Sequence, residues 1–227
     1  MDYKGSIKDV VKKYDSDTSR GLSAQDASAR LEKYGRNIIE SSNKKSLAKK
    51  IIEQIADPMV ILLIVASIIS AFTGDVVESI IIIAIVVINA IMSIIQEGRA
   101  EDSVAALQKM SSPEATVLRD GSRKKVKADE LVPGDVVILE TGDIIPADMR
   151  LIESSNLKID ESSLTGESVA VEKDSKIEVN EDVGIGDREN FAFSSSIVTY
   201  GHGKGLITQT GHDTEIGKIA TSLDSVE

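Results

Sequence analysis

The sequence of 227 residues contains no cysteine and no tryptophan, and it has few aromatic residues. Without cysteine the chain cannot form disulfides or thiolate metal sites. Aromatic side chains make up only 3% of the residues, which argues against a platform on which nucleic-acid bases stack. The net charge of -11 argues against a phosphate backbone as a partner, so we expect no nucleic acid. The N-terminal segment has no apolar core and does not look like a signal peptide.

Residues 1–50 predict a small N-terminal helical module. Apolar residues recur at helical spacing between Ile7 and Tyr14. A second helix is expected to begin at Ser23, which is followed three residues later by an aspartate at capping-box spacing. Gly35 is the expected C-terminal stop of this helix.

Long hydrophobic runs are confined to one part of the chain, where we expect a helical hairpin at 51–96. Residues 59–72 carry no charge, and extending this run back to about 51 makes it long enough to cross a hydrocarbon core of ~30 Å. The second run, at about 76–95, is also long enough to cross, although it contains Glu78 near its start. A tight turn, Thr73-Gly74-Asp75, joins the two. The alternative is a buried hairpin in a soluble core, but no other segment is apolar enough to surround two such helices.

Basic residues flank the two expected spans and are absent from the turn between them. They are Lys44, Lys45, Lys49, Lys50, Arg99 and Lys109. The positive-inside rule then predicts a multi-pass membrane protein with both termini in the cytoplasm and the lipid bilayer as a partner.

Beyond the second span the pattern changes from helix to strand. Residues 97–112 predict a cytosolic helical extension, which Pro113 ends. From 113 to 214, short β-prone runs alternate with turns rich in glycine, proline and aspartate, which is typical of an antiparallel β domain. Residues 215–227 look like the start of another helix. The expected fold class is therefore a membrane α-helical hairpin plus an all-β domain, with the small helical module before them.

The most informative loop is Thr165-Gly166-Glu167-Ser168. Gly166 allows a close backbone approach to a ligand, and Glu167 can orient or deprotonate a water molecule. The hydroxyls of Thr165 and Ser168 can donate hydrogen bonds to an oxyanion. The alternative is a surface turn stabilised by its hydroxyls, and these residues alone favour that alternative.

The same loop matches the TGES loop of P-type ATPases, and further motifs occur in the order of that family. They are VPGD at 132–135, GDxxPAD at 142–148, DESSLTGES at 160–168 and GxxTxIGKI at 211–219. The N-terminal module and the hairpin also occupy matching places. The resemblance therefore covers essentially the whole chain.

The resemblance implies that 113–214 is an actuator domain, which in this family is a distorted β jelly roll. It implies a cycle in which ATP, with Mg²⁺, phosphorylates an aspartate in a separate domain. The actuator then brings the loop to the aspartyl phosphate, where Glu167 activates water. In that picture Thr165 and Gly166 shape the approach to the phosphate, and Ser168 supports the loop.

The segment at 54–59 and the helical module are similar to the calcium-pump branch of the family (the P2 branch), in a bacterial form. We therefore expect Ca²⁺ as the transported cation and the bacterial plasma membrane as the location. Heavy-metal pumps usually carry cysteine-rich modules, which this chain lacks, whereas proton and sodium/potassium pumps remain open. Residues 215–227 would begin the linker to a third span.

The 227 residues contain no Asp-Lys-Thr-Gly phosphorylation motif. No nucleotide-binding domain is recognisable either, so we expect the sites of ATP, Mg²⁺ and the main ion ligands to lie outside this chain. The chain would then be the N-terminal part of a pump, inactive by itself and partnered by the pump's remaining domains. A second hypothesis is a non-catalytic, membrane-anchored module that binds or regulates a full-length pump. A third is a soluble β domain with an incidental apolar hairpin.

One departure from the family concerns a turn. The family often has Phe-x-Gly-Thr where this chain reads Phe193-Ser194-Ser195-Ser196. The missing glycine puts the turn in doubt, but not the chemistry.

Overall fold

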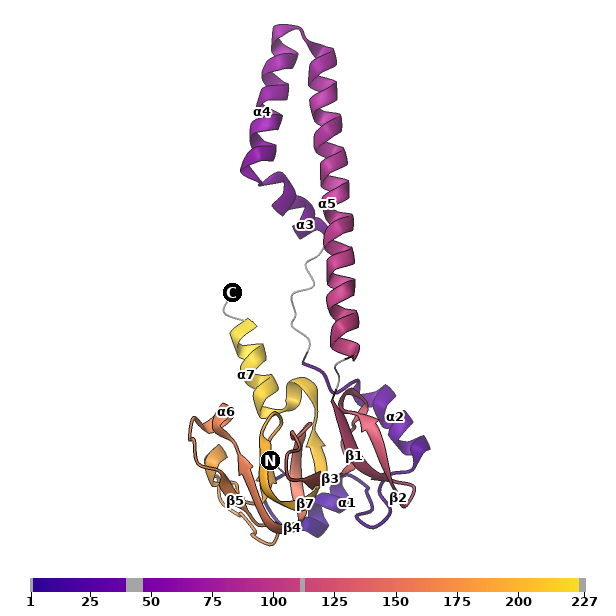
Figure 1. Cartoon of the computed structure of the whole chain (residues 1–227), viewed down its shortest axis with the longest axis vertical. Helices are drawn as coiled ribbons and strands as arrows, with labels where there is room; N and C mark the ends of the chain where they lie inside the picture. The colour runs from indigo at the N-terminus through magenta and orange to yellow at the C-terminus, as the bar shows by residue number, and fades with distance from the viewer. Residues whose placement is uncertain (1, 40–46, 111–112, 225–227) are drawn as a thin grey trace. The chain divides into compact units, whose positions relative to one another are not determined.

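The computed structural model describes residues 2–39, 47–110 and 113–224 (Figure 1). Internal contacts divide the chain into two units: unit 1 comprises Met1–Ser42 with Ser112–Glu227, and unit 2 comprises Asn43–Ser111. The N-terminal helices thus belong to the same compact unit as the β-sheet. The five-part division expected from the sequence remains a prediction.

Unit 1 contains an antiparallel sheet of strand order β2-β1-β3-β7-β4-β5, with β6 paired to β4 (Figure 1). The strands are β1 (Glu114–Arg119), β2 (Ser122–Lys127), β3 (Val136–Glu140), β4 (Asp148–Asp160), β5 (Val171–Lys173), β6 (Phe191–Ala192) and β7 (Ile197–Gln209). The long strands β4 and β7 pair with several register shifts, which bend the sheet. The antiparallel β domain expected from the sequence is confirmed.

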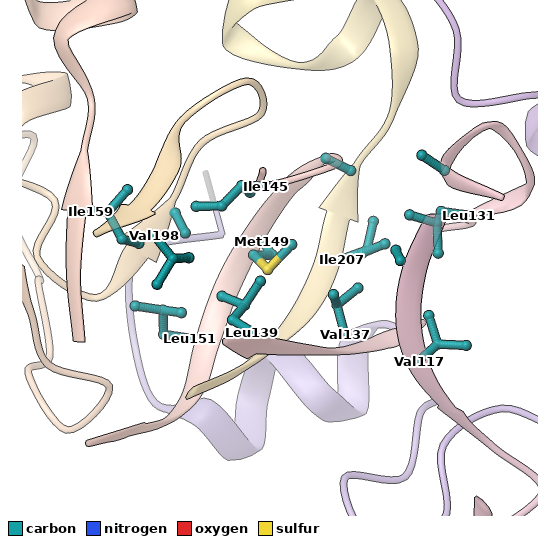
Figure 2. Close-up of a cluster of buried hydrophobic side chains, with 14 of the residues drawn as sticks. Val117, Leu131, Val137, Leu139, Ile145, Met149, Leu151, Ile159, Val198 and Ile207 are labelled. Carbon is teal, nitrogen blue, oxygen red and sulfur yellow. The ribbon is translucent and has the colours of Figure 1, made fainter. Parts of the chain in front are cut away.

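The core of unit 1 is built from alternate residues of these strands (Figure 2). Val137 and Leu139 of β3 are buried with Met149 and Leu151 of β4, because side chains two apart lie on the same face of a strand. Gly205 of β7 leaves the room that Met149 fills, since a Cβ there would lie 2.3 Å from the methionine sulfur. This packing fixes the register of the central strands.

Helices α1 (Ile7–Lys13) and α2 (Ala24–Tyr34) are present where the sequence predicts them. The Ser23 side chain accepts the N–H of Asp26 and so begins α2, and Gly35 ends it with φ 78°. Val10 of α1 packs in a hydrophobic cluster with residues of β3, β4 and β7. The two helices are therefore part of the β unit's structure.

Ser195 stands in the turn where the family often has glycine. Ser195 adopts φ 70°, a left-handed conformation that favours glycine, and its N–H donates to the Ile145 carbonyl over 2.9 Å. The serine at this position therefore holds the turn at the expense of local strain.

Replacing Ser195 by glycine is expected to stabilise unit 1 by about 0.5–1 kcal/mol. Relief of the left-handed strain gives about 1–2 kcal/mol, and the extra flexibility of glycine in the unfolded chain offsets about 0.5–1 kcal/mol. Urea denaturation followed by circular dichroism measures the change. Ser163→Gly is the control, because Ser163 is exposed and its φ is not positive. It should lower stability, and a Ser195→Gly variant that behaved likewise would contradict the strain argument.

Unit 2 contains α3 (Leu47–Ile55), α4 (Pro58–Thr73) and α5 (Val76–Met110). The expectation of one helix over about 51–72 is wrong, because α3 and α4 meet at a bend of 68°. The reason lies at the junction: Pro58 has no N–H to continue the helix, and the Asp57 side chain accepts the N–H groups of Met59 and Val60. Proline and its preceding cap begin a new helix here.

Helices α4 and α5 contact each other and are joined by a turn at Gly74, which has φ 100°. The Ser67 hydroxyl lies 2.8 Å from that of Ser79 and links the two helices near the turn. By length and composition, 76–100 of α5 could cross a membrane. Helices α3 and α4 are long and apolar enough to do so only when they are counted together as one bent span.

Candidate functional site

The 165–168 loop follows β4 through the single turn of α6 (Ser162–Thr165). This turn begins where the Asp160 carboxylate accepts the Ser162 N–H over 2.9 Å. It ends at Gly166, whose φ of 75° places it in the left-handed region, where glycine is favoured. A Cβ on Gly166 would meet no atom within 4 Å, so the backbone at the bend is open to a partner.

Thr165 fixes the loop from within. Its hydroxyl donates to the Glu161 carbonyl over 3.1 Å and accepts the N–H of Glu167 over 3.2 Å. Glu167 and Ser168 are exposed, whereas Thr165 is half-buried. The structure therefore brings the four predicted site residues together as one short loop. Its acidic side chain faces outward, and the threonine hydroxyl is engaged in holding it.

A buried ion pair lies at the base of this loop. Lys173 Nζ is 2.7 Å from Glu161 Oε1, and both side chains have 0% exposure. Among the described residues, neither oxygen of this carboxylate accepts a hydrogen bond of regular geometry, so the lysine is its main compensation. Burial raises the pKa of Glu161 and lowers the pKa of Lys173, and the attraction between them opposes both shifts.

Nothing in the sequence pointed to this pair. Glu161 lies within the DESSLTGES motif without standing out in it, and Lys173 belongs to none of the motifs. A single lysine in a short strand carries no local signal, because its partner lies twelve residues away on another element.

Asp148, the last residue of the GDxxPAD motif, is also buried. Its carboxylate accepts the N–H of Ser194 and that of Glu215, each over 2.8 Å, and so caps α7 (Glu215–Asp224). Burial raises the pKa of Asp148 to about 6, against the two backbone hydrogen bonds and assisted by the Glu215 carboxylate. The motif thus connects the sheet to the start of α7.

The raised pKa of Asp148 predicts a pH-dependent stability. Between pH 4 and 6 the folded chain keeps a proton that the unfolded chain releases, so stability falls by about 2 kcal/mol as the pH rises over this range. Asp148→Asn should remove this part of the pH dependence in urea denaturation. As a control, Asp160→Asn should leave the slope between pH 4 and 6 unchanged, because the Ser162 hydrogen bonds lower the pKa of Asp160. Equal slopes in wild type and Asp148→Asn would contradict the assignment.

The surroundings of the loop can be searched for groups that would hold a metal ion or a phosphate. No group of three histidine or carboxylate side chains among the described residues is placed to hold a metal ion. The loop and its flanks at 160–169 contain carboxylates but no lysine, arginine or histidine to bind a nucleotide phosphate. The loop can instead present one carboxylate to a group carried by another domain.

Two family models match the chain. The model of the P-type ATPase actuator domain matches residues 109–224, and that of the cation transporter/ATPase N-terminus matches residues 2–70. The first match covers half of the chain. The exposed TGES loop on an antiparallel sheet therefore lies in an actuator domain, and the chain belongs to the P-type cation-transporting ATPase family.

Curated relatives share this relationship over most of the chain. A calcium-transporting ATPase of Listeria monocytogenes is 49% identical over 92% of this chain, and calcium-transporting ATPase 1 of Bacillus cereus is 44% identical over 94%. A sodium/potassium exporting P-type ATPase of Schizosaccharomyces pombe is 43% identical over 97%. The chain spans about a quarter of the length of these relatives, 24%, 24% and 22% respectively.

Proposed function

We propose that this chain is the N-terminal part of a calcium-transporting P-type pump of the P2 branch. In this proposal the 165–168 loop supports hydrolysis of an aspartyl phosphate that forms in another domain. The observation that carries it is the placement of Glu167, exposed on a loop bent by Gly166 and fixed by Thr165. This geometry suits a carboxylate that acts on a partner domain.

The chemistry assigned to Glu167 is general base catalysis. Its carboxylate orients a water molecule and accepts a proton as the water attacks the phosphoryl group. Gly166 lets the backbone come close to that group, and Ser168 supports the loop beside it. The hydrogen bond between the Glu167 N–H and the Thr165 hydroxyl limits the positions that the carboxylate can reach.

Unit 2 serves in this proposal as the membrane anchor. The large apolar side chains of α4 and α5 are mostly exposed, which lipid would cover. The basic residues outside the turn favour a topology with both termini in the cytoplasm. The β unit is then a cytoplasmic actuator of distorted jelly-roll form, and 215–227 leads toward a third span.

The choice of calcium rests on the names of two bacterial relatives and on the 54–59 segment. Membranes from the source cells, incubated with γ-labelled ATP with and without calcium, test it on an acidic gel probed for this chain. We expect a calcium-dependent, acid-stable phosphorylated band at about four times the 24.3 kDa of this chain, since it spans 24% of the first relative. Phosphorylation that depends on sodium instead would contradict the choice of calcium but not the proposed role as part of a pump. A probed band that is never phosphorylated would favour the regulatory module.

A further inference from the structure

Glu161 and Lys173, here called the buried pair, place two opposite charges inside unit 1. Counted over the whole residue, backbone included, Glu161 is 1% and Lys173 2% exposed. Burying two charges requires their removal from water, and a well-packed apolar pair is often as stable or more so. Stability by itself therefore does not account for an ion pair at this position. Its location beneath the loop suggests a role in fixing geometry.

Glu161 is the residue to which the loop is attached. Its carbonyl accepts the N–H of Leu164 over 2.9 Å and that of Thr165 over 3.0 Å, together with the Thr165 hydroxyl. The hydroxyl in turn accepts the N–H of Glu167. A displacement of Glu161 is thus passed through Thr165 to the backbone of Glu167.

Lys173 is itself held from the opposite side. Its Nζ donates to the Arg188 carbonyl over 3.1 Å and lies 5.6 Å from the centre of the Phe193 ring. The Arg188 guanidinium stacks 4.3 Å from the centre of the Tyr3 ring and lies 3.9 Å from a carboxylate oxygen of Glu215. The ammonium is therefore fixed relative to both the N-terminal segment and the first residue of α7.

We propose, resting on the proposed function, that Lys173 is a positioning residue for phosphoenzyme hydrolysis, acting through Glu161 and Thr165 on Glu167. The ammonium of Lys173, on β5, holds the carboxylate of Glu161, the residue that follows β4, at one point. The carbonyl of the same residue then fixes the turn of α6 and, through the Thr165 hydroxyl, the position of the Glu167 backbone. Without the ion pair the turn can shift, and the carboxylate spends less time in line with the phosphoryl group.

The test uses a full-length pump containing this chain, in which both charges are removed together by Glu161→Gln with Lys173→Met. Joint removal avoids an unpaired buried charge and keeps the side-chain volumes similar. We expect the rate constant for hydrolysis of the phosphoenzyme, measured in a chase of labelled protein, to fall about tenfold. Phosphorylation by ATP should stay within twofold. The rate constant per phosphorylated molecule does not depend on how much protein folds, so a purely structural role would not change it.

The matched control is the pair Glu153 and Lys204, 2.8 Å apart on the same sheet, whose side chains are 60% and 29% exposed. Glu153→Gln with Lys204→Met should hydrolyse the phosphoenzyme at the wild-type rate. Wild-type hydrolysis in the folded Glu161→Gln, Lys173→Met protein would overturn the proposal. If that protein does not fold, Glu161→Asp decides, because it keeps both charges but shortens the side chain that meets Lys173; wild-type hydrolysis in that variant would also overturn the proposal.

A double-mutant cycle with Glu167→Gln separates this inference from the function on which it rests. If the buried pair acts through Glu167, removing the pair in a Glu167→Gln pump causes no further slowing. Additive slowing would overturn the route through Glu167. If Glu167→Gln alone leaves hydrolysis unchanged, the proposed function fails. If it slows hydrolysis and loss of the pair does not, the positioning role alone fails.

Discussion

Glu167→Gln in a full-length pump containing this chain is expected to slow hydrolysis of the phosphoenzyme by about 100-fold or more. General base catalysis typically contributes 10²–10⁴-fold, and glutamine keeps the size of the side chain but cannot take the proton from water. The side chain is exposed, so the substitution should not affect folding. Phosphorylation by ATP, which in the proposed cycle takes place in another domain, should continue at its normal rate. The phosphorylated form would then accumulate.

The measurement is a chase with unlabelled ATP after brief phosphorylation with γ-labelled ATP. Glu172→Gln provides a control, because Glu172 is an exposed carboxylate five residues further along the chain, in β5. It should turn over as the wild type does. Normal decay of the phosphoenzyme in the Glu167→Gln pump would contradict the catalytic role of the loop. It would not affect the assignment of the chain to the family.

Local signals in the sequence predicted much of the fold. Ser23 and Gly35 mark the ends of α2 because capping is decided within a few residues of the helix end. The change from helical to alternating patterns after Pro113 located the β domain. The four residues of the candidate loop are adjacent in the chain, so finding them required no knowledge of tertiary contacts.

The break between α3 and α4 was visible in the sequence but was misinterpreted. Asp57-Pro58 has the form of an N-cap followed by proline at the first helical position. The continuous apolar composition of the segment instead predicts one long helix. Composition measures transfer into lipid, whereas the backbone at a proline is decided by sterics and the missing N–H.

Long-range contacts could not be predicted from the sequence. The packing of Val10 against the sheet, and the ion pair between Glu161 and Lys173, join elements that are not adjacent in the chain. The motif resemblance in the sequence points to the loop but not to what lies beneath it. Such partners follow from strand order and register, which hydrophobic periodicity does not determine by itself.

Asp135→Asn is expected to destabilise unit 1 by about 3–5 kcal/mol. Asp135, the last residue of the VPGD motif, is fully buried and accepts two hydrogen bonds from Arg119, over 2.8 and 2.6 Å. It also accepts the N–H of Val132 over 3.0 Å. Asparagine would leave the arginine, whose side chain is 12% exposed, without a counter-charge and would turn an N–H₂ group toward one of these donors. Domains are typically stable by only 5–15 kcal/mol, so the loss would be a large share of the total.

Urea denaturation of the two proteins measures the difference. Glu140→Gln is the control, because Glu140 pairs with Arg123 over 4.0 Å with both side chains about two-thirds exposed, and its loss should cost less than about 1 kcal/mol. The cause of the larger effect can be separated with Arg119→Met. If the damage comes from an unpaired buried cation, adding Arg119→Met to Asp135→Asn should recover part of the lost stability. If the two losses simply add, the motif stabilises the sheet through the hydrogen bonds of Asp135 to the backbone, and the ion pair contributes little.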